Sequence, residues 1–158
     1  MNGLLNWISK TSSLWMLLAA TVLLTYAFQF LAGQLGIVFI DNMSSPDDAM
    51  AAIAGFTADQ RSAHAWITGT VDVAYPLAYG LFFAGTALHF FPNAGRYLCW
   101  PLLAVIPVDL LEGLVQIMAL IGNDGGIGAK AILTPLKFGL LLAGLAIAIA
   151  GWLRWLWL

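Results

Sequence analysis

The chain is short of charged residues. Only 9% of its 158 residues are Asp, Glu, Lys or Arg, whereas a soluble globular domain carries about 25%. The formal net charge of -2 is too small to indicate a nucleic-acid partner. Because 61% of the residues are hydrophobic, the composition predicts an integral membrane protein rather than a soluble one.

Cysteine is almost absent, since Cys99 is the single one in the chain. This excludes an intramolecular disulfide and a cysteine-based metal cluster. The sequence also lacks a P-loop, a dinucleotide fingerprint, the zinc-protease and serine-hydrolase motifs and a haem-attachment site. His64 would need further metal ligands, and only carboxylates are at hand. We therefore predict no metal site and no cofactor.

Long apolar runs are the dominant feature of what is present. A membrane-spanning helix needs roughly 20 mostly apolar residues, and four runs qualify, at about 14–40, 66–91, 97–121 and 131–153. The last three are joined by short loops, which predict antiparallel neighbours. The predicted fold class is an all-α, integral membrane four-helix up-down bundle, formed by a single domain over residues 1–158.

The connection between the first two runs is longer and has helix signals of its own. Ser45 can cap a helix whose first residue is Pro46, which predicts a short helix at the membrane interface. Thr57 and Gln60 have the spacing of a capping box. The second long helix is therefore expected to start outside the bilayer and to continue into the run at 66–91.

The basic residues outside the runs predict the orientation. Lys10, Arg96 and Arg154 fall on one side of the membrane, and Arg61 and Lys130 fall on the other. Cytoplasmic loops carry an excess of Lys and Arg. The small excess on the first side favours a cytoplasmic location for both termini.

Each apolar run also carries a stripe of polar residues. A charged side chain at the bilayer centre costs at least about 2.5–3.5 kcal/mol on insertion scales, so these stripes should face one another rather than lipid. Residues three or four apart share one face of a helix. The stripes are Thr25 and Gln29; His64, Thr68, Asp72, Tyr75 and Tyr79; Asp109, Glu112 and Gln116; and Lys130, Thr134 and Lys137.

Four stripes that meet at the bundle centre predict a polar pocket, opening toward the non-cytoplasmic side and closed by apolar packing below. The residues expected to form it are Gln29, Asp72, Tyr75, Tyr79, Asp109, Glu112, Gln116 and Lys137, with His64 and Thr134 also counted among the ligand-binding residues. Lys130 is assigned to the loop region. Asp72, Asp109 and Glu112 would therefore have Lys137 as the one lysine facing them.

Grouped carboxylates inside an apolar site are typical of acid–base chemistry. The leading hypothesis is therefore a protein that binds, and as an enzyme isomerises or cyclises, a small amphipathic or lipidic molecule. Glu112 would be the proton donor or base, Asp72 its partner and Lys137 the electrostatic stabiliser, with Asp109 as the fourth catalytic candidate. The expected partners are membrane lipids and a lipophilic small molecule.

Two alternatives stay open. The stripes can be structural, because buried polar groups hydrogen-bond membrane helices together; the chain would then be an accessory or scaffold subunit of a larger complex. A proton or ion pathway is the other alternative, and it requires a second opening on the cytoplasmic side. Protein partners or a homo-oligomer are compatible with either one.

Three segments carry a resemblance. "VDVAYPLAYGLFF", "PVDLLEGL" and "TPLKFGLL" resemble the recurring motifs of an uncharacterised family of small bacterial four-helix integral membrane proteins. The resemblance implies a bacterial inner-membrane location. In layout alone, the chain is similar to the EXPERA group, which includes sterol isomerases and the sigma-2 receptor and has acidic residues in an intramembrane pocket.

Overall fold

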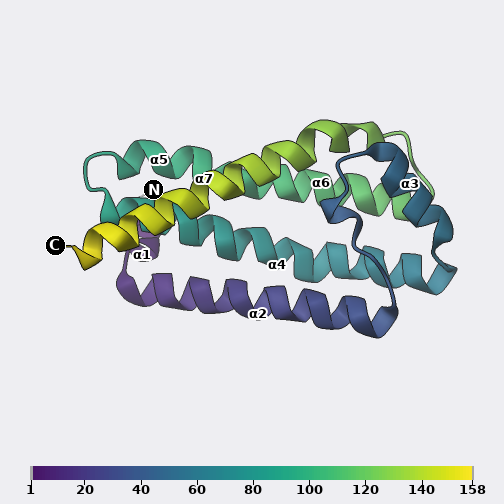
Figure 1. The fold of residues 1–158 in the computed structure, drawn as a ribbon, viewed down its shortest axis with the longest axis horizontal. Helices are drawn as coiled ribbons and strands as arrows, with labels where there is room; N and C mark the ends of the chain where they lie inside the picture. The colour runs from purple at the N-terminus through teal and green to yellow at the C-terminus, as the bar shows by residue number, and fades with distance from the viewer. Residues whose placement is uncertain (1, 158) are drawn as a thin grey trace.

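The chain is helical along nearly its whole length (Figure 1). The computed structural model describes residues 2–157, so residues 1 and 158 of the predicted domain lie outside the described part. The elements in chain order are α1 (Asn2–Ile8), α2 (Thr11–Leu35), η1 (Ile40–Asn42), α3 (Pro46–Gly55), α4 (Ala58–Phe90), α5 (Gly95–Leu103), α6 (Val105–Leu120), η2 (Ile127–Ala129) and α7 (Lys130–Leu156).

Four helical segments are long and apolar enough to cross a membrane: Thr11–Leu35, Ala58–Phe90, Gly95–Leu120 and Ile127–Leu156. They confirm the predicted all-α class and its four long apolar helices. The central element is α4, which packs against α2, α5, α6 and α7. Both ends of the chain lie at the same end of the bundle (Figure 1).

Two helix ends follow directly from local sequence. The helix α2 stops at Leu35, before the predicted 40, because Gly36 adopts the left-handed conformation (φ 58°) and donates its N–H to the carbonyl of Ala32. The helix α4 starts at the predicted capping box, in which Thr57 and Gln60 each accept the other's backbone N–H. This start outside the apolar run is therefore confirmed.

The third apolar run is divided between α5 and α6, a break that the sequence prediction missed. The break lies at Ala104, whose own N–H still bonds to the carbonyl of Trp100. Pro107 has no N–H to donate to the carbonyl of Leu103, four residues earlier. The series of helical backbone hydrogen bonds is therefore interrupted at Leu103. The short helix α1 was also missed, because seven residues are too few to show a clear period.

The segment between α2 and α4 folds back over one end of the bundle. The helix α3 forms where it was predicted, with the Ser45 hydroxyl accepting the backbone N–H of Asp48 at 3.3 Å. Ile53 of α3 and Ile40 of η1 pack into an apolar cluster with Ala119 and Leu120 of α6. That α3 lies at a membrane interface stays a prediction.

The other half of the bundle, nearest α1, is filled by apolar side chains. Its buried core contains Ile8, Leu14, Leu17, Phe82, Phe83, Leu102, Val105 and Ala148. The helix α7 comes very close to α4 in this half, because a Cβ added at Gly144 would lie 2.5 Å from Cδ2 of Phe83. A Cβ added at Gly139, five residues earlier on α7, would meet nothing within 4 Å.

We expect Gly144→Ala to destabilise the protein by about 1 to 3 kcal/mol, since overpacking a filled core forces its neighbours apart. Gly139→Ala is the matched control, and it should be neutral or stabilising by up to about 1 kcal/mol, because alanine is the better helix former. Thermal unfolding of both variants in one detergent measures the difference. Equal midpoints would show that α7 is not held tightly against Phe83.

Candidate functional site

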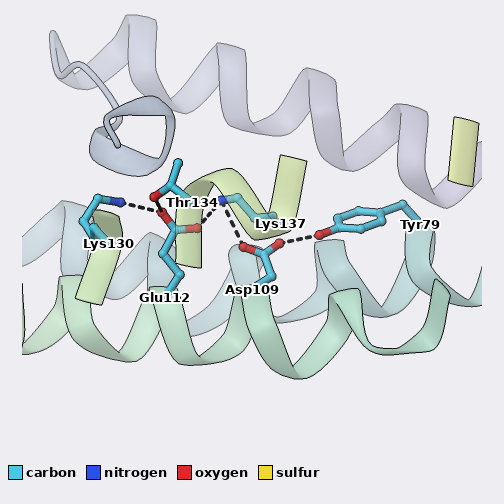
Figure 2. A network of polar contacts seen from close by, with 6 residues as sticks. All are labelled: Tyr79, Asp109, Glu112, Lys130, Thr134 and Lys137. Atoms are coloured by element: carbon cyan, nitrogen blue, oxygen red, sulfur yellow. Dashed lines mark hydrogen bonds and ion pairs between the residues drawn. The ribbon is translucent and has the colours of Figure 1, made fainter. Parts of the chain in front are cut away.

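A buried polar network joins α6 to α7 (Figure 2). The Oε1 atom of Glu112 accepts hydrogen bonds from Lys130 Nζ and from Thr134 Oγ1, both at 2.5 Å. Its Oε2 atom lies 2.6 Å from Lys137 Nζ. The Glu112 side chain is 0% exposed, so one carboxylate deep in the bundle collects three donors from one face of α7. Charge-assisted bonds of this kind are about twice as strong as neutral ones.

Asp109 extends the network toward α4. Its Oδ1 atom lies 3.1 Å from Lys137 Nζ, and its Oδ2 atom accepts the hydroxyl of Tyr79 at 2.6 Å. Lys137 therefore bridges Asp109 and Glu112, which stand one turn apart on α6 (Figure 2). The two polar stripes predicted for these helices face each other.

The expected charge balance of one lysine against three acids is wrong. Lys130 is the first residue of α7 and is fully buried, at 0% exposed, where it pairs with Glu112. The network thus contains two carboxylates and two ammonium groups, which balance when all four are ionised. The prediction failed because Lys130 follows a glycine-rich turn, and it was therefore assigned to the loop.

A cavity of about 180 Å³ lies beside this network, among α2, α4, α6 and α7. Its lining includes six residues of the predicted pocket: Gln29, Asp72, Tyr75, Tyr79, Asp109 and Lys137. The remaining lining residues are Thr25, Phe28, Phe39, Asp41, Asn42, Phe138 and Leu141. The bundle therefore brings at least one residue of each polar stripe to the wall of one space.

Four predicted site residues do not line this cavity. Glu112, Gln116, Thr134 and His64 are all buried within the protein, at 0 to 1% exposed. The expectation that Glu112 exchanges a proton with a bound molecule does not fit this geometry, because Lys137 stands between Glu112 and the cavity. Glu112 is placed instead to hold Lys137 in position.

His64 and Gln116 lie toward the α3 end. The Nδ1 atom of His64 is 3.3 Å from the hydroxyl of Thr68, and its ring makes edge contacts with Phe39. The side-chain amide of Gln116 is buried without a hydrogen-bond partner among residues 2–157. Both side chains therefore belong to the packed interior behind the cavity rather than to its surface.

Sequence reasoning missed the part of the cavity wall contributed by η1 and the residue before it. Phe39, Asp41 and Asn42 line the cavity, although the sequence placed the end of a membrane helix and a loop there. The available signal was Gly36, because a helix that ends at a left-handed glycine turns the following residues back toward the bundle.

Comparisons with known proteins do not add a relative. No family model matches this chain, and neither a curated protein nor a solved structure matches it.

Glu112→Gln tests whether the network holds α6 to α7. The substitution leaves Lys130 buried without its counter-charge, and breaking a buried ion pair in this way costs about 3 to 5 kcal/mol. We expect a correspondingly lower thermal midpoint in detergent. Asp124→Asn, which removes an exposed carboxylate in the turn before α7, is the control and should leave the midpoint unchanged. A Glu112→Gln midpoint equal to the wild-type value would contradict a structural role for the network.

Proposed function

We propose that this chain is an integral membrane protein that binds the polar head group of an amphipathic molecule in the cavity beside Asp109 and Lys137. The observation that carries the proposal is the cavity itself, which combines charged, hydroxyl and aromatic side chains within an apolar bundle. Its volume of about 180 Å³ is smaller than the roughly 300–1,000 Å³ of sites that enclose a whole drug-sized ligand. It suits a head group whose apolar tail remains outside.

The packing of α2 supports an opening toward the membrane. The helices α2 and α7 both line the cavity, yet they scarcely pack against each other. Their aromatic contact is the Trp15–Trp152 pair, with ring centroids 5.5 Å apart, at the α1 end of the bundle. Farther along, α2 lies along one side of α4 and α7 lies across from it (Figure 1). A tail could leave the cavity between these two helices.

The second half of α2 is a loosely held wall of the cavity. The buried residues of α2, Ser13, Leu14 and Leu17, all belong to its first two turns. Its later residues include Leu23 and Phe30, which are 69% and 66% exposed. Exposed side chains of this kind suit contact with lipid tails. A bound amphiphile would therefore have its tail among the bilayer lipids that surround α2.

The membrane assignment is part of the proposal. Four apolar helices of sufficient length support integration into a bilayer, and an even number of spans places both termini on one side. The excess of Lys and Arg at the terminal end favours the cytoplasm for that side. The bacterial inner membrane is the proposed location, on the resemblance of the three segments described above.

Conversion of the bound molecule by proton transfer would use groups that touch it. Among the four catalytic candidates, Asp72, Asp109 and Lys137 line the cavity and Glu112 does not. Asp109 is already engaged by Tyr79 and Lys137. Asp72 forms no ion pair with a described lysine or arginine, so Asp72 is the proposed proton-transfer group if the protein acts as an isomerase or cyclase.

Filling the cavity tests the proposal. Leu141→Trp places an indole in the cavity wall, whereas Leu142→Trp, one residue on, adds the same bulk to a side chain that is 62% exposed. Wild type and both variants would be titrated in lipid nanodiscs with decyltrimethylammonium, decyl sulfate and decyl maltoside, with empty nanodiscs as the blank.

We expect at least one of these probes to bind the wild type and Leu142→Trp equally. Leu141→Trp should bind it at least about tenfold more weakly, a loss of about 1.4 kcal/mol of binding free energy. Equal binding by Leu141→Trp, or no binding of any probe by the folded wild type, would contradict the proposed function.

A further inference from the structure

Two carboxylates at the cavity have no cationic partner. Asp72 is 8% exposed and lines the cavity, and no described lysine or arginine forms an ion pair with it. Asp41 also lines the cavity, and both of its carboxylate oxygens are buried without a hydrogen-bond partner among residues 2–157. The two carboxyls are close enough to interact with each other. Uncompensated buried charge is costly, so a cation from outside the chain would stabilise the ionised form of this pair.

The neighbouring cations are already engaged. Lys137 is the lysine that lines the cavity, and it is held by Asp109 and Glu112 at 3.1 and 2.6 Å. Lys130 is bound to Glu112 and lies away from the cavity. After these pairs are balanced, the neighbouring carboxyls of Asp41 and Asp72 remain without a lysine or arginine of their own. The cavity therefore presents an excess of negative charge to whatever enters it.

Aromatic rings cover the wall next to these carboxylates. Phe39, Phe28, Tyr75 and Tyr79 form a continuous series of edge contacts, with successive ring centroids 5.1, 5.6 and 5.1 Å apart. All four line the cavity. Ring faces attract organic cations, with a strength of about 0.5 to 2 kcal/mol each depending on how dry the site is. A carboxylate beside aromatic rings is therefore suited to an ammonium group that carries carbon substituents.

We propose that the cavity selects an organic cation, namely the protonated amine or quaternary ammonium head group of an amphiphile. Asp72 contacts the head group directly, Asp41 adds negative charge behind it, and the rings of Phe28, Phe39 and Tyr75 surround its carbon substituents. This inference rests on the proposed function, because it names the chemical class of the molecule that the cavity takes.

Other head groups fit less well. An anionic head group would need free cationic donors, and Lys137 already serves two carboxylates. A metal ion would need converging ligands, and residues 2–157 contain no group of three His, Cys, Asp or Glu side chains that could hold one. The aromatic wall also offers such an ion nothing that it prefers. Organic cations are the class that uses both the carboxylates and the rings.

The test compares the three decyl probes on the full-length protein in phosphatidylcholine nanodiscs. Decyltrimethylammonium, decyl maltoside and decyl sulfate share one tail and differ in head-group charge. The variants are Asp72→Asn and Asp41→Asn, with Asp124→Asn as a control that removes an exposed carboxylate outside the cavity lining. Calcium chloride alone serves as an inorganic-cation probe. Binding is measured by calorimetry and by the shift of the thermal midpoint.

We expect the ammonium probe to bind wild type at least about tenfold more tightly than the other two probes. Asp72→Asn should abolish this preference, Asp41→Asn should reduce it about threefold, and Asp124→Asn should retain it. Without ligand, the midpoints of Asp72→Asn and Asp41→Asn should equal or exceed that of wild type, because each removes an uncompensated buried charge. This readout also shows that the variants fold.

Three results would overturn the inference. If the three probes bind wild type equally, and Leu141→Trp abolishes their binding, the cavity does not select by charge although the proposed function stands. If no probe binds the folded wild type, the proposed function fails and the inference fails with it. If calcium protects wild type and not the Asp variants, while the ammonium probe does not, the site takes an inorganic cation.

Discussion

The structure depends on the contact between Glu112 and three donors of α7. Lys130, Thr134 and Lys137 occupy one face of that helix and converge on a single carboxylate with 0% exposure. Apolar packing has little directional preference, and in a bilayer it gives weak preference for one helix register over another. A carboxylate that must be reached by two ammonium groups allows few rotations or shifts of α7 relative to α6. The same contact holds Lys137 at the edge of the cavity.

Charge pairing separates the buried polar residues into two groups. Asp109 and Glu112 have partners on α4 and α7 and are explained by the fold alone. Asp41 and Asp72 have no lysine or arginine paired with them among the described residues, and both line the cavity among α2, α4, α6 and α7. Burying an unpaired carboxylate lowers stability. The carboxyls of Asp41 and Asp72, rather than the larger network beside them, are therefore the best place to look for a function.

Much of this arrangement could be predicted from residue spacing. Steps of three and four placed Asp109 with Glu112 and Lys130 with Lys137, and the facing rows follow from the cost of charge in an apolar bundle. Residue spacing could not give the depth of a side chain within the bundle, because it did not show that Lys130 is buried. It also could not give the path of the chain after Gly36, which brings Asp41 to the cavity. A loop's position depends on tertiary packing that no helical period encodes.

The two ends of α2 have different surroundings, and this difference bears on how a molecule would enter. At the α1 end, Leu14 and Leu17 are buried and Trp15 contacts Trp152 of α7. At the cavity, α2 is tied to the bundle by the Thr25–Tyr75 hydroxyl contact at 3.1 Å and the contact of the Phe28 and Tyr75 rings. Elements with few buried contacts open locally at low free-energy cost. The second half of α2 is therefore the less firmly packed wall of the cavity, held at its end by Gln60 of α4, whereas the Glu112 network fixes the opposite wall.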